Sequence, residues 1–143
     1  MKRVITSAVF VSAFVSLLVL GLVSRVQAEC SNASKKGTYG FTCQGTMDGS
    51  PVALVGTCTF DGKGHGTAKF VASGTDTIPP EEVHVTLTYT VNSDCTGIDE
   101  NTFPDGSKNY TYFVIDNHTQ ELRDILIVPG DTGTIVACVQ RKL

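Results

Sequence analysis

The segment VHVTLTYTV, from Val83 to Val91, alternates apolar and polar residues along its whole length. Its odd-numbered positions hold Val, Leu or Tyr, and its even-numbered positions hold His or Thr. Successive side chains of a β-strand point to opposite faces of the sheet. The segment therefore predicts a strand with one buried face and one face in water.

Seven further segments show apolar residues at period two, and clusters of Gly, Pro, Asn and Asp separate them about every eight to twelve residues. No helical period is visible between residues 37 and 142, so we predict an all-β fold. The other predicted strands cover residues 37–43, 51–60, 66–74, 97–103, 109–117, 121–128 and 133–142.

The connections between these strands are mostly short and rich in turn residues, as in DGKGHG after Phe60, PDGSK after Phe103 and PGDTG after Val128. Only TDTIPPEE, from Thr75 to Glu82, interrupts the series of hairpins. Eight short strands in sequence fit an antiparallel up-and-down barrel or a two-sheet β-sandwich. We favour the barrel, because sequential hairpins without a long crossover are what a closed meander requires.

The N-terminus has the layout of a signal peptide. Lys2 and Arg3 precede an apolar run, and the small residues of VQA at Val26–Ala28 suit a cleavage site. We expect residues 1–28 to be removed, which leaves 115 of the 143 residues as a single domain, 29–143. An uncleaved N-terminal anchor is the alternative, because the run is long enough to span a bilayer.

The mature chain is predicted to be acidic. Loss of Lys2, Arg3 and Arg25 lowers the basic residues from 11 to 8 against 14 acidic ones, so the formal net charge falls from -3 to -6. Nucleic acids and anionic membranes are bound by clustered Lys and Arg, which this chain lacks. We therefore expect neither partner, and predict a secreted or periplasmic protein.

Five cysteines, Cys30, Cys43, Cys58, Cys95 and Cys138, lie in the exported part, where disulfides form. Cys30 and Cys95 occupy irregular segments, so we predict that they pair and fix the mature N-terminus to the turn in YTVNSDCTG. Cys43 is placed to pair with Cys58 across the first hairpin, or with Cys138 if the first and last strands are neighbours. Buried free thiols are the alternative for these three.

Motifs for metal binding or catalysis are absent from the sequence. Its three histidines, at positions 65, 84 and 118, are far apart and have no ligand-type spacing, so no metal or cofactor is predicted. The glycines of DGKGHG fit a tight turn better than a calcium loop. The acidic pairs Glu81–Glu82 and Asp99–Glu100 are interpreted as loop charge, and no catalytic residue is proposed.

GTYGF near the start and QRKL at the end resemble the calycin barrels, which include the lipocalins. The resemblance implies that Gly37 and Tyr39 open the first strand, as Gly and Trp do in that group, and that Arg141 lies across the Tyr39 ring. The segments CSNASKKGTYGF, TFDGKG, YTVNSDCTG and YFVIDN are similar to small secreted bacterial proteins of unassigned function. Size and strand number also resemble the allene oxide cyclase and dirigent barrels.

Two classes of function remain open from the sequence. The first is a non-catalytic barrel that binds a small apolar ligand, with Phe41, Tyr89 and Tyr112 as candidate lining residues. The second is a barrel filled by its own side chains that serves as an envelope or extracellular interaction module. An enzyme of the cyclase or isomerase kind is a more distant third. The first class requires an open barrel interior and the second a filled one, so the state of the interior distinguishes them.

Overall fold

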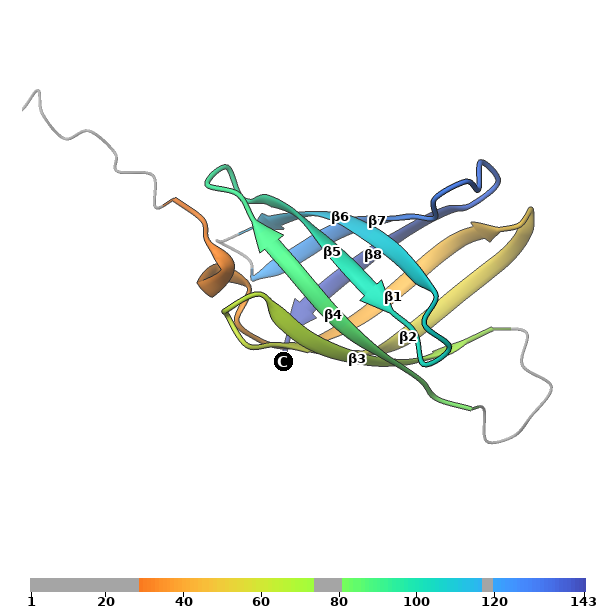
Figure 1. The fold of residues 1–143 in the computed structure, drawn as a ribbon, viewed down its shortest axis with the longest axis horizontal. Coiled ribbons are helices and arrows are strands. Elements are labelled where there is room, and N and C mark those ends of the chain that lie inside the picture. The colour runs from red at the N-terminus through yellow and green to blue at the C-terminus, as the bar shows by residue number, and fades with distance from the viewer. Residues whose placement is uncertain (1–28, 74–80, 117–119) are drawn as a thin grey trace, which may run out of the picture.

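The computed structural model describes residues 29–73, 81–116 and 120–143. The predicted signal peptide, most of the predicted linker between Thr75 and Glu82, and His118 lie outside the described residues. Within the described ranges the chain forms one closed antiparallel barrel in which strands neighbour each other in sequence order (Figure 1). The prediction of an all-β up-and-down barrel is confirmed, and the sandwich alternative is wrong.

A short 3-10 helix, η1 (Asn32–Lys35), precedes the first strand. The strands are β1 (Gly37–Met47), β2 (Ser50–Phe60), β3 (His65–Ala72), β4 (Val83–Val91), β5 (Thr96–Thr102), β6 (Lys108–Asp116), β7 (Glu121–Ile127) and β8 (Ile135–Lys142). In β4 the buried positions are the odd-numbered residues from Val85 to Val91, as the alternation predicts.

Pairing of the first strand with the last closes the barrel. β1 and β8 are antiparallel, and their register places Cys43 opposite Cys138. These two cysteines form a disulfide. The sequence left Cys58 and Cys138 as possible partners of Cys43, and the pairing of β1 with β8 selects Cys138.

The first hairpin explains why Cys58 is left without a disulfide. Asp48 and Gly49 form its two-residue turn with φ values of 50° and 75°, the left-handed conformation that type I′ turns require. This turn sets a register in which Cys43 is opposite Leu54, while Cys58 is opposite Tyr39. A Cys43–Cys58 bridge is excluded by that register, and Cys58 is a buried free thiol.

The predicted Cys30–Cys95 disulfide is present and fixes the N-terminal segment to the β4–β5 turn. Cys95 has a φ of 69°, which residues with side chains seldom adopt. Hydrogen bonds from Cys95 N to Asn92 O (3.1 Å) and from Ile115 N to Cys95 O (2.9 Å) hold this turn. The segment that includes η1 is thereby anchored against the barrel.

The two ends of the barrel are built differently. Figure 1 shows η1 at one end, and the β1–β2 and β7–β8 hairpins at the other. At the η1 end, Tyr39, Phe60 and Tyr89 are buried and pack edge to face, with ring centroids 5.8 Å apart for Tyr39–Phe60 and 5.3 Å for Phe60–Tyr89. In the described part of the chain, this aromatic core therefore closes the barrel at the η1 end.

Candidate functional site: a cavity inside the barrel

A cavity of about 620 Å³ occupies the barrel interior between the aromatic core and the opposite end. Its lining includes Asp48, Ser107 and Lys108, which are solvent-exposed, so the cavity reaches the surface at the end away from η1. Inward-facing side chains supply its apolar walls. Among them are Phe41, Leu54, Phe70, Val85, Leu87, Phe103, Leu126, Val128 and Val136.

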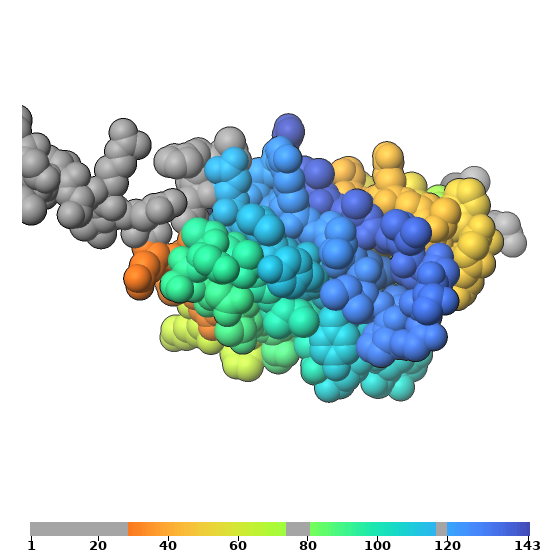
Figure 2. Space-filling view, turned by 90° about the horizontal axis from the view of Figure 1, so that it is seen from above, coloured from red at the N-terminus to blue at the C-terminus, as the bar shows by residue number. Residues whose placement is uncertain are grey.

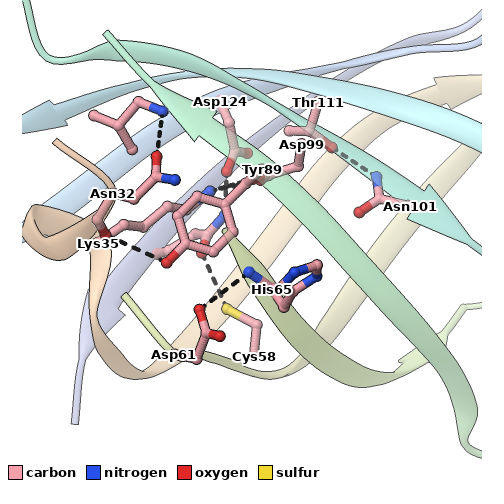
Figure 3. Close-up of polar contacts among 12 residues, drawn as sticks. Asn32, Lys35, Cys58, Asp61, His65, Tyr89, Asp99, Asn101, Thr111 and Asp124 are labelled. Atoms are coloured by element: carbon pink, nitrogen blue, oxygen red, sulfur yellow. Dashed lines mark hydrogen bonds and ion pairs between the residues drawn. The ribbon is translucent and has the colours of Figure 1, made fainter. Parts of the chain in front are cut away.

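A buried ion pair adjoins the inner end of the cavity, and its acidic partner, Asp99, contributes to the lining. Lys35 is fully buried, and its Nζ lies 2.5 Å and 2.6 Å from the two carboxylate oxygens of Asp99. Asp99 comes from β5 and is 3% exposed. Lys35 reaches it from the last position of η1 (Figure 3). The helix that closes the barrel thus also delivers a cation to its interior.

Aromatic rings surround the Lys35 ammonium group. Its Nζ lies 3.5 Å from the ring centroid of Phe113 and 4.2 Å from that of Phe60. Such rings attract a cation through their negative faces. Burial lowers the pKa of Lys35 and raises the pKa of Asp99, while the attraction between the two groups opposes both changes. Both carboxylate oxygens of Asp99 therefore accept hydrogen bonds from Lys35.

A second polar group at the inner end consists of Asp124, Gln140 and Cys58. The Gln140 side-chain amide donates a hydrogen bond to Asp124 Oδ2, and the Cys58 thiol donates one to Gln140 Oε1 at 3.1 Å. All three side chains are buried and contribute to the cavity lining. They come from β7, β8 and β2, which the closed sheet brings around one interior.

One carboxylate oxygen of Asp124 has no hydrogen-bond donor within the described part of the chain. Its side chain is 5% exposed, and none of the described residues donates a hydrogen bond to Oδ1. Burial raises the pKa of Asp124 to about 6, against the opposing effects of the Gln140 hydrogen bond and the Lys35 charge. A buried carboxyl group with a free oxygen in a cavity is a candidate for contact with a ligand.

The chemistry available at this site is binding and proton exchange rather than nucleophilic attack. Burial raises the pKa of the Cys58 thiol to about 12, so the thiolate is scarce at neutral pH. Burial instead raises the pKa of Asp124 to about 6, closer to neutral pH than its ordinary value. The apolar walls with a few polar groups at one end have the composition of a small-molecule site.

The structure divides the three predicted lining residues. Phe41 lies in the cavity wall, where its ring packs against Phe70 with centroids 6.4 Å apart. Tyr89 belongs to the buried core at the η1 end, and its hydroxyl group accepts a hydrogen bond from Gly62 N (2.8 Å) and donates one to Asn32 O (3.3 Å). It therefore closes the barrel and is not part of the cavity lining.

The prediction that Tyr112 lines the interior is wrong. Tyr112 is 42% exposed and stands opposite Ile98 and Ile125, which are also exposed. Phe113, the next residue, is the one that points inward. Because Tyr112 and Phe113 are adjacent aromatic residues, the sequence did not show which of the two faces the interior.

The predicted contact of Arg141 with the Tyr39 ring is also wrong. Tyr39 is buried at 2% exposure, but Arg141 is exposed, and its Nε donates to Glu121 Oε2 at 3.0 Å. Alternation along β8 turns Gln140 inward and Arg141 outward. Among the described residues, the buried cation is instead Lys35. Gly37 begins β1 with a φ of 138°, a conformation that side chains rarely adopt.

The interpretation of Asp99 as loop charge is wrong, and Lys35, Asp124 and Gln140 were not singled out by sequence reasoning. For the two carboxylates, Asp99 and Asp124, the signal lay in the strand registers. Asp99 is opposite Tyr89, and Asp124 is opposite Phe113. Directly opposed residues of an antiparallel pair point to the same face, so each carboxylate had to share the inner face with an aromatic ring.

Among the described residues no cluster of three or more His, Cys, Asp or Glu side chains is arranged to hold a metal ion. The DGKGHG segment forms a turn in which Asp61 Oδ1 accepts hydrogen bonds from Lys63 N (2.6 Å) and His65 N (3.0 Å).

The described part of the chain has no helix long and apolar enough to cross a bilayer. Comparisons with family models, curated proteins and solved structures find no match for this chain.

Proposed function

We propose that the protein binds a small, largely apolar molecule inside the barrel and does not transform it chemically. The observation that supports this proposal most strongly is the cavity of about 620 Å³ with apolar walls. This volume lies within the range of about 300 to 1,000 Å³ that is common for small-molecule sites. A barrel filled by its own side chains would have no such space.

The arrangement of the barrel supports the same proposal. One end is closed by η1 and the aromatic core, so a ligand would enter at the hairpin end. An eight-stranded meander barrel with an internal cavity is also the architecture that the calycin resemblance implies. The resemblance itself stays a prediction.

We place this binding function outside the cytoplasm. Two disulfides, Cys30–Cys95 and Cys43–Cys138, fit an oxidising compartment. Together with the predicted signal peptide they support a secreted or periplasmic protein. N-terminal sequencing of the exported chain tests this, because cleavage after Ala28 gives a mature chain that starts at Glu29.

Titration with Nile red, a neutral apolar dye, tests the binding function. We expect saturable fluorescence enhancement by the folded wild type. In Leu126→Trp the larger side chain occupies the cavity and should weaken binding by about tenfold or more. Ile125→Trp is the matched control, because Ile125 is the preceding residue and is 53% exposed on the outer face.

Binding by wild type and Ile125→Trp, with loss in a folded Leu126→Trp, supports the interior site. The proposal is wrong if the folded wild type does not bind the dye, or if both variants bind it like the wild type. Circular dichroism of each variant establishes that the barrel is intact.

An interaction module is the second candidate function. It is favoured by a row of exposed apolar side chains, Ile98, Tyr112 and Ile125, on the adjacent strands β5, β6 and β7. The face of the molecule that these strands form is seen in Figure 2. Exposed apolar residues are common on protein surfaces, so this row carries less weight than the cavity. Concentration-dependent sedimentation that Ile125→Asp abolishes would favour this candidate.

A further inference from the structure

We propose that the ligand carries a protonated amine at one end of an apolar body, and that this amine binds Asp124 Oδ1 at the inner end of the cavity. The inference rests on the proposed binding function and specifies the ligand class. Its starting point is the buried carboxylate oxygen that lacks a donor among the described residues. Asp124 is 5% exposed and belongs to the cavity lining.

The charges around Asp124 leave a negative charge to be balanced. Lys35 on η1 is the buried cation at this end, and it already contacts both oxygens of Asp99 on β5. The other neighbours are Gln140 on β8, which is neutral, and the Cys58 thiol on β2. With Asp124 ionised, this group of side chains carries a net charge of -1.

Hydrogen-bond capacity points to a donor on the ligand. Gln140 occupies Asp124 Oδ2, while the buried Oδ1 has no donor among the described residues, so an N–H or O–H group of a ligand in the adjoining cavity would satisfy it. A neutral hydroxyl group would supply the hydrogen bond but leave the charge unbalanced. A protonated amine supplies both, and a carboxylate ligand would be repelled.

The remaining walls suit an aliphatic or aromatic body behind that amine. Phe41, Phe70, Leu87 and Leu126 are part of the lining between the polar end and the mouth. Such a molecule places its charged group deepest and its apolar part towards the opening. This orientation separates the proposal from simple attraction of cations to the acidic residues at the mouth, which include Asp48.

Three probes with the same eight-carbon chain test the inference: n-octylamine, 1-octanol and octanoate. Their affinities are measured by calorimetry at about pH 7.5, where Asp124 is ionised. We expect n-octylamine to bind about tenfold or more tightly than 1-octanol, since hydrogen bonds to charged groups are the stronger ones. Octanoate should bind weakest.

Asp124→Asn should remove the preference for the amine while 1-octanol still binds. Asp48→Asn is the matched control, because it deletes an exposed carboxylate at the mouth and should leave the preference intact. If Asp124→Asn does not fold, the wild type at about pH 4.5 replaces it. Protonation of Asp124 should then lower n-octylamine affinity towards that of 1-octanol.

The outcomes separate the two proposals. Equal affinity for n-octylamine and 1-octanol overturns the amine inference but leaves the binding function in place. Retention of the preference in a folded Asp124→Asn, or its loss in Asp48→Asn, also overturns it. Failure of the wild type to bind either probe or Nile red overturns the binding function as well.

Discussion

Lys35 and Asp99 are 64 positions apart in the sequence and form a bidentate ion pair inside the barrel, with Nζ–O distances of 2.5 Å and 2.6 Å. Lys35 enters from η1, which the Cys30–Cys95 disulfide anchors to the end of the barrel. Asn32 Oδ1 also accepts a hydrogen bond from Val91 N at 2.8 Å. The ion pair therefore links the N-terminal segment to the sheet interior.

Removal of one partner of this pair should be strongly destabilising. Lys35→Met leaves the Asp99 carboxylate buried without its cation, and we expect a loss of about 3 to 5 kcal/mol in the free energy of unfolding. Urea denaturation measures it. Lys36→Met is the matched control, because Lys36 is exposed and should change stability by less than about 0.5 kcal/mol.

The double variant Lys35→Met/Asp99→Leu tests the cause of that loss. With no buried charge left, it should be more stable than Lys35→Met alone. A Lys35→Met protein as stable as the wild type would show that the pair contributes little. Equal stability of the single and double variants would assign the loss to packing instead.

The sheet could be predicted from the sequence but the ion pair could not, for a physical reason. Alternation predicts which face of an isolated strand is apolar, and it is strongest in β4, where Thr separates Val and Leu. In β5 the pattern is inverted, because Ile98 is exposed while Asp99 is buried. Only the pairing of Asp99 with Tyr89 across the β4–β5 turn reveals that inversion.

Lys35 illustrates a second limit of sequence reasoning. In CSNASKKG two lysines follow each other, and a lysine in a polar segment is ordinarily solvated. The direction of a side chain in one turn of 3-10 helix depends on how the helix is anchored. The Cys30–Cys95 pairing could be predicted from the chain, but the resulting orientation of Lys35 could not.

The Cys43–Cys138 disulfide should contribute much of the stability of the closed barrel. It spans 95 positions, and a cross-link of this length stabilises by about 4 to 5 kcal/mol in the chain-entropy model. We expect the variant with both cysteines replaced by Ser to lose that amount in denaturant titrations. Cys58→Ser keeps a donor for Gln140 and should lose about 1 kcal/mol.

Equal stability of the Cys43/Cys138 double variant and Cys58→Ser would contradict this expectation. Peptide mapping under non-reducing conditions gives an independent check. It should recover peptides joined through Cys43 and Cys138 and a Cys58 peptide that carries no partner.

Cys58 should react slowly with alkylating agents while the barrel is folded. Burial raises its pKa from 9.0 to about 12, which lowers the thiolate fraction by about a thousandfold at neutral pH. Iodoacetamide labelling followed by mass spectrometry should therefore modify Cys58 in urea but not in buffer. Labelling at the same rate in both conditions would mean that the thiol is accessible and ionisable in the native state.

Asp124 should make the barrel less stable as the pH rises through its titration. The pKa of Asp124 is about 6 in the folded protein against an ordinary value of 3.8, so the folded state binds more protons between these values. The contribution of Asp124 to the free energy of unfolding is therefore greatest below about pH 4. It declines up to about pH 6 and stays at its lower level above that pH. Asp124→Asn removes the decline.

The comparison of the two proteins across pH isolates Asp124 from the other carboxylates. Relative to Asp124→Asn, the wild type should lose roughly 2 to 3 kcal/mol in the free energy of unfolding between about pH 4 and pH 7. Urea denaturation at a series of pH values measures this difference. A constant difference would mean that Asp124 keeps its ordinary pKa. A difference that changes in favour of the wild type would mean that a cation balances the carboxylate even without ligand.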